Sequence, residues 1–272
     1  MSRFQIAEAV REGRSLADLC PIIDLHGHAG PFPGFLVLGG DPKDMIAVMD
    51  RVGVQAQMVA PHIAIGPSAR AGNEMALDMV RRYPGRFIGY AVPFPHQPET
   101  AGDELRRALD AGLTAIKLHP SVHQYRIVDP GYRVAFEVAA ERDTFILVHT
   151  WRVDPMCTTA MLQDLAREFP AVPVLMGHSG GGPEGFPEFI GLARQYPNLY
   201  LDTTCSYTFG YWIRRMAEEG GIDKVVYGSD LPFIDARYGL GKVALSGLDD
   251  EALRQVLREN GRRLLAAAGV AL

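Results

Sequence analysis

Short apolar runs alternate with longer amphipathic stretches along the chain, and the alternation repeats eight times. The short runs are typical of buried parallel strands, whereas the stretches between them have the spacing of helices with one apolar face. The predicted strands are 22–28, 54–60, 87–92, 115–119, 145–149, 172–176, 199–203 and 224–228. The main predicted helices are 44–52, 73–83, 99–111, 132–142, 159–169, 184–196, 211–219 and 249–268.

Eight successive strand–helix units favour a closed parallel barrel over an open sheet. The length of 272 residues suits one such barrel, and no shift in composition marks a second domain. We therefore predict an α/β protein with a single (β/α)8 TIM-barrel domain over residues 1–272. In this fold the functional side chains lie at the C-terminal ends of the strands. The Gly- and Pro-rich segment 29–40 is too long for a simple turn, so we expect a loop over the mouth of the barrel.

Titratable side chains gather where the apolar runs end. The first run closes with His26-Gly27-His28, and alternation along a strand directs both imidazoles to the same side. Later runs end at or near His119, His149, His178 and Asp230. Two histidines alone fit a ligand pair and a pair of hydrogen-bonded core residues equally well. Burying all these groups without a cation would cost on the order of several kcal/mol, so the pattern predicts a divalent metal site, preferably for zinc.

Composition and charge narrow the classes of partner. The net charge of −5 comes without a basic cluster, which argues against nucleic acid, and no apolar stretch is long enough to span a bilayer. Residues 1–5 are expected to open a charged helix rather than a signal peptide. Cys20, Cys157 and Cys205 are too far apart for a disulfide framework. We expect a cytoplasmic protein with a small-molecule substrate, no membrane partner and, by default, a symmetric homodimer.

Several local motifs accompany these strand ends, and together they span almost the whole chain. They are Asp24-Leu25-His26-Gly27-His28, Pro84-Gly85-Arg86-Phe87-Ile88-Gly89-Tyr90, Ile116-Lys117-Leu118-His119-Pro120, His149-Thr150, Gly177-His178-Ser179-Gly180-Gly181, Tyr227-Gly228-Ser229-Asp230-Leu231-Pro232 and Glu259-Asn260-Gly261-Arg262-Arg263-Leu264-Leu265. In these motifs the sequence resembles the amidohydrolase superfamily. Within it, the chain is similar to the amidohydrolase-related (amidohydrolase 2) branch of compact metal-dependent barrels, which includes decarboxylases, hydratases and hydrolases.

The resemblance implies a role for each donor. His26, His28, His149 and Asp230 would hold the catalytic cation. Asp230 would also contact a metal-bound water, and His178 would act beside it as an acid, a base or an electrostatic donor. A cation lowers the pKa of its bound water towards about 7, and a neighbouring carboxylate can then take the proton and return it to a leaving group. Asp24 either orients one of the histidines or is a strand-end carboxylate that binds backbone.

Lys117 bears on the number of metals. The resemblance leaves two alternatives. Beside one cation, an unmodified Lys117 would contact substrate or pair with a carboxylate; in a binuclear centre, a carboxylated Lys117 would bridge two cations, and His149 and His178 would hold the second. We favour one cation. His119 shares the face of Lys117 and is expected to contact substrate. Arg152 follows His149 closely and could hold a substrate carboxylate through two parallel hydrogen bonds, although a loop arginine is more often a surface ion-pair partner.

The leading functional prediction is a metal-dependent hydrolase that attacks a small ester, lactone or amide with activated water. The alternative is a metal-dependent lyase, a decarboxylase or hydratase acting on a carboxylated aromatic or dienoate substrate. Arg152 is the feature of the sequence that favours the lyase. A third hypothesis, a metal-stabilised binding protein without catalysis, conflicts with the number of titratable groups, because a structural zinc site is closed by four ligands.

Overall fold

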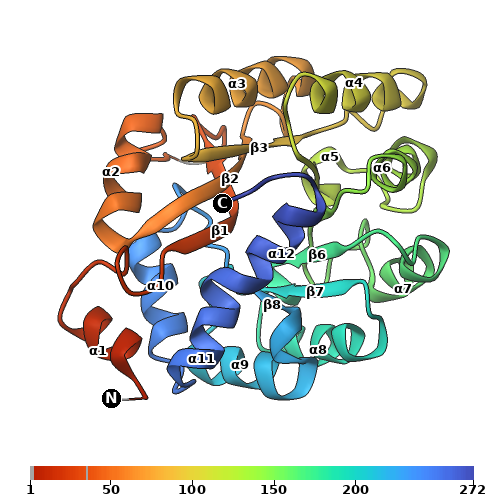
Figure 1. The fold of residues 1–272 in the computed structure, drawn as a ribbon. Coiled ribbons are helices and arrows are strands. Elements are labelled where there is room, and N and C mark those ends of the chain that lie inside the picture. The colour runs from red at the N-terminus through yellow and green to blue at the C-terminus, as the bar shows by residue number, and fades with distance from the viewer. Residues whose placement is uncertain (1–2, 35) are drawn as a thin grey trace.

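Eight parallel strands form the centre of the molecule, each paired with the next in sequence order (Figure 1). The computed structural model describes residues 3–34 and 36–272, so the expectations that concern Met1, Ser2 and Phe35 lie outside the described residues. The strands are β1 (Ile22–Ala29), β2 (Val54–Pro61), β3 (Phe87–Ala91), β4 (Ala115–Leu118), β5 (Ile146–His149), β6 (Val174–Gly177), β7 (Leu199–Asp202) and β8 (Val225–Val226). The predicted TIM-barrel architecture is confirmed.

The barrel closes where the last strand meets the first. Leu25 N donates to Tyr227 O at 2.9 Å, Asp230 N to His26 O at 2.8 Å and His28 N to Leu231 O at 2.8 Å. All three contacts lie beyond β8, which is shorter than the predicted strand 224–228. The closing hydrogen bonds therefore connect the candidate donor His26 directly to the candidate donor Asp230.

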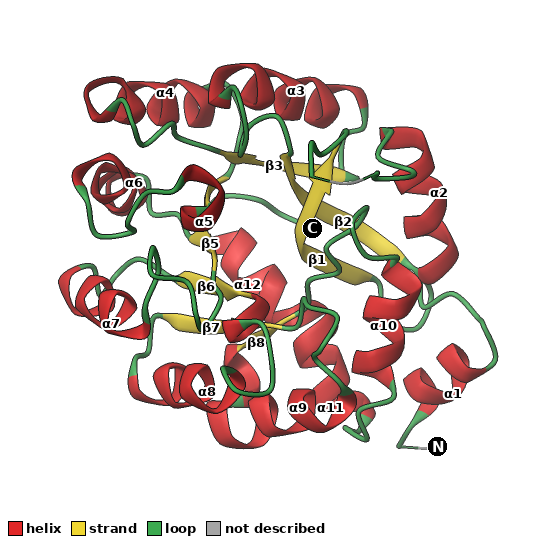
Figure 2. Cartoon of the chain, turned by 180° about the vertical axis from the view of Figure 1, so that it is seen from behind, coloured by secondary structure: helices red, strands yellow, loops and turns green. Residues whose placement is uncertain are grey.

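Helices surround the strands on the outside (Figure 2). They are α1 (Gln5–Arg11), α2 (Pro42–Val52), α3 (Ala69–Arg82), α4 (Pro98–Asp110), α5 (Pro120–His123), α6 (Pro130–Glu141), α7 (Thr159–Glu168), α8 (Phe186–Gln195), α9 (Gly210–Arg215), α10 (Ala236–Ala244), α11 (Asp250–Arg254) and α12 (Asn260–Ala267). The sequence pattern missed α10, because Gly239 and Gly241 interrupt its apolar spacing. Asp235 nevertheless caps it by accepting a hydrogen bond from Arg237 N.

Apolar side chains fill the barrel from one end. Ile23, Leu25 and Phe145 belong to one buried cluster inside the barrel, and Leu264 and Leu265 of α12 complete it. In Figure 1, α12 crosses this end of the strands. The polar strand ends consequently lie at the opposite face. None of the helices in the described part of the chain combines the length and the apolar character that a bilayer-spanning segment needs.

Asn260 anchors α12 to the last strand, and its loss is expected to destabilise the barrel. Its fully buried side chain donates to Ile222 O and Val225 O, both at 2.8 Å. Asn260→Ala leaves two carbonyls without this donor, so we expect the free energy of unfolding to fall by about 2–4 kcal/mol, measured by urea denaturation. Arg262→Ala, on the exposed side of the same helix, should change it by less than about 1 kcal/mol. Equal urea midpoints for Asn260→Ala and Arg262→Ala would contradict the anchoring role of Asn260.

Candidate metal centre

β1 positions the imidazoles of His26 and His28, and both are oriented through Nδ1. His26 Nδ1 donates to Asp202 Oδ2 at 2.7 Å, and His28 Nδ1 donates to Ala60 O at 2.9 Å. Because these acceptors hold the protons on Nδ1, each Nε2 keeps its lone pair. The two Nε2 atoms lie 3.7 and 3.4 Å from Asp230 Oδ1. The predicted convergence of these three side chains is present.

Asp230 follows β8 in a left-handed backbone conformation with φ of 66°, which is uncommon for a residue with a side chain. Its Oδ1 is buried and accepts no hydrogen bond from the described residues. Burial alone would raise the pKa of this carboxyl group, but the imidazoles of His28, His178 and His26 outweigh it and hold the pKa well below its usual range. The result is an ionised carboxylate oxygen directed at three imidazoles.

His178 completes a compact group of donors. It begins a short 3-10 turn after β6 and has a positive φ of 64°. Burial lowers the pKa of His178 to about 4, so its imidazole is neutral at pH 7. Its buried Nδ1 has no hydrogen-bond partner among the described residues. One donor atom each of His26, His178 and Asp230 lies within 4.8 Å of the others.

His149, at the end of β5, lies beside this group. Its ring stacks on that of His119 with 4.0 Å between centroids, and its centroid is 4.6 Å from that of His178. The ring of Trp151 lies parallel to that of His149 at 6.1 Å. Burial holds the pKa of His149 well below its usual range, so the imidazole is neutral. The three donors that lie within 4.8 Å of one another are those of His26, His178 and Asp230. Ligation by His149 therefore stays a prediction.

The side chain of Lys117, on β4, extends to the group of candidate metal donors. Its side chain is fully buried, and Nζ donates to His26 Nε2 at 2.9 Å. Burial lowers the pKa of Lys117 to about 8, which still leaves most of the amine charged at pH 7. The carboxylates of Asp230 and Asp202 act electrostatically on this ammonium group and raise its pKa, which offsets part of the effect of burial. A buried cation at the edge of the donor group is a point at which a further anion is favoured.

Arg152 and Asp24 occupy different surroundings. The Arg152 side chain is 48% exposed, and its Nε lies 3.9 Å from Glu188 Oε2 on α8. Asp24 is fully buried and accepts from His26 N, Ser229 N, Ser229 Oγ and Gln57 Nε2. Asp24 therefore binds backbone and neighbouring polar groups, not the imidazole of either histidine. These contacts match the second of the two alternatives stated for it.

The structure also adds aromatic residues and a carboxylate that sequence reasoning missed. His62, one residue past β2, stacks on His28 with 4.8 Å between centroids, and its Nδ1 donates to Gly30 O. The ring of Phe233 lies 4.3 Å from that of His62, and Phe32 lies 5.2 Å from Phe233. We call Phe32, His62 and Phe233 the aromatic wall. Asp202, at the end of β7, is the missed carboxylate; a strand-end position was the available signal for it and for His62.

A divalent cation fits these side chains. Metal ligands must be deprotonated, and the site offers neutral imidazoles at His28, His149 and His178 together with the ionised carboxylate of Asp230. Asp230 Oδ1 and His178 Nδ1, which belong to two of the converging side chains, are buried without a hydrogen-bond partner among the described residues. Each of these atoms can supply a lone pair to a cation, which would remove the cost of leaving it unpaired. Nitrogen and oxygen donors of this kind suit zinc and manganese.

Comparisons with known proteins agree with this fold. The sequence model of a family described as amidohydrolase matches residues 23–266. A 2,6-dihydroxybenzoate decarboxylase from Rhizobium superposes with a TM-score of 0.70 at 17% identity, covering 91% of this chain and 99% of that one. A 5-carboxyvanillate decarboxylase from Novosphingobium aromaticivorans, complexed with manganese, superposes with a TM-score of 0.74 at 15% identity, covering 93% and 97%.

A hydratase has the same architecture. The 4-oxalomesaconate hydratase from Rhodopseudomonas palustris superposes with a TM-score of 0.67 at 20% identity, covering 91% of this chain and 96% of that one. At such low identities the superpositions establish a common fold, and the activities belong to the proteins compared. What they share with this chain is a complete barrel of nearly equal length.

Proposed function

Because this chain belongs to the amidohydrolase family, we propose that it is a metal-dependent lyase that decarboxylates a small aromatic carboxylic acid. Sequence reasoning ranked hydrolysis first and the lyase second. The decarboxylases and the hydratase among the structural neighbours favour the second alternative. The observation on which the proposal rests is the buried ammonium group of Lys117.

Lys117 distinguishes an anionic substrate from a neutral one. Its Nζ lies 2.9 Å from His26 Nε2, so an anion bound to it would also lie beside the candidate metal donors. A neutral ester or amide would leave this charge opposed only by Asp230 and Asp202, whereas a substrate carboxylate would bond to it directly. The same ammonium would suit a carboxylated dienoate, so a hydratase remains the alternative lyase.

The aromatic wall favours a ring over a dienoate. Phe32, His62 and Phe233 present ring faces and edges next to His28, with 5.4 Å between the centroids of His28 and Phe233. Aromatic rings prefer such offset and edge-to-face neighbours, at separations of about 4.5–7 Å. A planar ring held against this wall would place its substituents toward the donors of β1.

His26, His28 and Asp230 would hold the cation, with His178 and His149 within reach. The sequence favours one cation and zinc, and the Novosphingobium neighbour contains manganese. A bound divalent cation would stabilise the negative charge that develops on substrate oxygen.

Asp230 is ionised and can act as a proton carrier. For a ring with a hydroxyl group, the Asp230 carboxylate would take the hydroxyl proton and deliver it to the ring carbon that bears the substrate carboxylate. The bond from that carbon to the carboxylate then breaks, its electron pair returns to the ring, and carbon dioxide leaves with a phenolate as the other product. His178, neutral and beside Asp230, would hold the proton in transit or donate a hydrogen bond.

The reaction is tested with zinc-loaded and manganese-loaded protein. We expect carbon dioxide to be released from hydroxylated aromatic acids such as 2,6-dihydroxybenzoate or 5-carboxyvanillate, and no comparable turnover of lactones or esters. Turnover of neutral esters alone would overturn the proposal and restore hydrolysis. Water addition to a carboxylated dienoate, without carbon dioxide release, would identify a hydratase.

Lys117→Met is expected to lower kcat/KM for the carboxylated substrate at least thirtyfold, which corresponds to about 2 kcal/mol for the loss of a buried charged partner. Metal content per chain should be unchanged, because unmodified Lys117 is not a ligand. Arg152→Met is the matched control and should change kcat/KM by about twofold or less, since that side chain is half-exposed. A larger loss of kcat/KM in Arg152→Met than in Lys117→Met would assign the substrate carboxylate to Arg152, as the sequence pattern suggested.

A further inference from the structure

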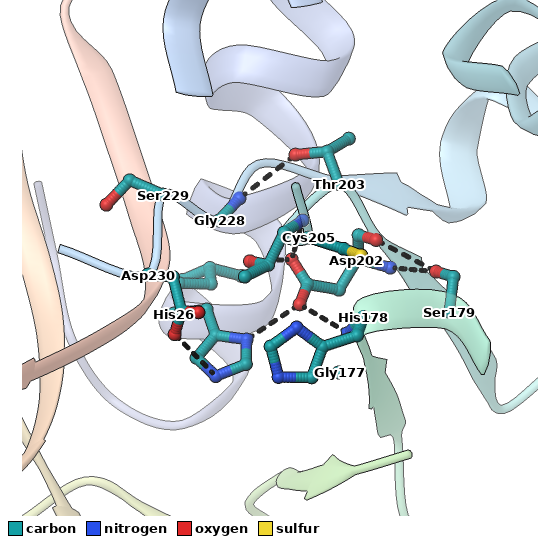
Figure 3. Close-up of polar contacts among 12 residues, drawn as sticks. His26, Gly177, His178, Ser179, Asp202, Thr203, Cys205, Gly228, Ser229 and Asp230 are labelled. Atoms are coloured by element: carbon teal, nitrogen blue, oxygen red, sulfur yellow. Dashed lines mark hydrogen bonds and ion pairs between the residues drawn. The ribbon is translucent and has the colours of Figure 1, made fainter. Parts of the chain in front are cut away.

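Asp202 ends β7, and its carboxylate accepts four hydrogen bonds while only 1% of the residue is exposed. Oδ2 accepts from His26 Nδ1 at 2.7 Å and from His178 N at 3.1 Å. Oδ1 accepts from Thr204 N at 3.1 Å and Thr204 Oγ1 at 2.8 Å. Figure 3 shows the contacts to His26 and His178 meeting at one carboxylate oxygen. One side chain thus links β1, the turn after β6 and the segment after β7.

The first link fixes the protonation of His26. Asp202 Oδ2 lies 2.7 Å from His26 Nδ1 and also accepts from His178 N. Lys117 Nζ donates to the other ring nitrogen, Nε2, so the proton of the His26 imidazole lies on Nδ1, where it is donated to Asp202. Nε2 then keeps the lone pair that accepts from Lys117 and faces Asp230.

The second link holds a strained turn. His178 and Ser179 have positive φ values of 64° and 47°, a conformation that residues with side chains rarely adopt. Ser179 Oγ donates to Asp202 O at 2.8 Å and accepts from Asp202 N at 2.9 Å. Together with the hydrogen bond from His178 N to Asp202 Oδ2, these bonds give three hydrogen bonds between Asp202 and the turn.

Gly228 packs against the Asp202 carboxylate, where a larger residue would not fit. A Cβ atom at Gly228 would collide with Asp202 Oδ1, Thr204 Oγ1 and His26 Cβ. Gly228 N donates instead to Thr203 Oγ1 at 3.2 Å. The chain leading to Asp230 therefore packs directly on the same carboxylate.

We propose that Asp202 is a positioning residue that sets two imidazoles at once: it keeps the proton of His26 on Nδ1, and it holds the left-handed turn that directs His178 toward His26. The effect on metal affinity rests on the proposed function. The effect on the two imidazoles is a property of the metal-free protein.

The test begins with nitrogen-15 NMR of the histidine rings in the metal-free protein. We expect wild-type His26 to be protonated on Nδ1, and Asp202→Asn to shift the proton partly or wholly to Nε2, because the amide can no longer accept as an anion. Zinc affinity, measured by competition with a chromophoric chelator, should fall tenfold to a hundredfold, the usual effect of removing such a partner. Thr204→Val is the matched control: it removes one donor to Oδ1 and should leave the tautomer unchanged and the zinc affinity within twofold.

Ser179→Ala separates the two links, because it loosens the turn without touching the carboxylate. His26 should keep its tautomer while the ring signals of His178 shift. A wild-type His26 protonated on Nε2, or an Asp202→Asn variant with unchanged tautomer and zinc affinity, would overturn the inference. If wild-type protein bound no zinc or manganese, the proposed function would fail, while the NMR results would still decide the role of Asp202.

Discussion

Replacing both His26 and His28 by alanine is expected to remove the divalent metal and to reduce turnover to the background rate. Their Nε2 atoms lie 3.7 and 3.4 Å from Asp230 Oδ1, so the double variant deletes the nitrogen donors that face the carboxylate. Of the three proposed ligands only Asp230 remains in the double variant, and His149 and His178 lie beside it at the ends of other strands. Metal per chain, measured by elemental analysis, should fall from about one to near zero, together with carbon dioxide release.

His96→Ala is the control for the loss of a histidine as such. This residue is exposed, and its Nε2 bonds to His123 O away from the centre. It should keep full metal content and activity. Metal retained by the double variant would refute the ligand assignment. Two metals per wild-type chain, with an acid-labile mass increment on Lys117, would replace the single-cation proposal by the binuclear alternative.

Asp230→Asn should separate metal binding from chemistry. The amide keeps the size of the side chain and one oxygen donor but cannot carry a proton, so the imidazoles should retain much of the metal while kcat falls by about a hundredfold to ten-thousandfold. The measurement is kcat and metal content on one batch of protein. Asp235→Asn, at the exposed start of α10, is the control and should be near wild type in both.

Near-normal turnover of Asp230→Asn with full metal occupancy would assign the proton transfer to another group. His178 is then the residue to replace, because one of its ring nitrogens lies in the same group of donor atoms as Asp230.

Alternation along β1 was sufficient to predict that His26 and His28 converge, even though the pairing of β1 with β2 shifts register between Asp24 and Gly27. The prediction holds because both imidazoles lie inside one short strand, where the backbone alone determines their direction. The fold was predictable for a similar reason, since eight strand–helix repeats leave few other closed arrangements. The short β8 was not, because its successor residues turn inward to bond with β1 instead of extending a ladder.

The sequence predicts little about site residues whose positions depend on loops or on contacts between distant segments. Phe32 and Phe233 lie in segments without helical or strand periodicity, so nothing in their spacing predicts that their rings meet. Asp202 sits at the end of a correctly predicted strand, but its role depends on His26 and His178, which approach it only in the closed barrel. Arg152 looked suitable from its place after His149, whereas the actual direction of its loop turns it toward Glu188.

The closing contacts between β1 and the segment after β8 imply an order of events in folding. Ser229 N donates to Asp24 Oδ1 across 205 residues of sequence, so this junction is among the least local in the chain. Such contacts carry the largest loop-closure cost and are expected to form late. A chain that has formed only its first seven strands holds His26 and His28 but lacks Asp230. The donor set is therefore a product of the final ring closure, and loosening that one junction separates the donors even while the other strands stay paired.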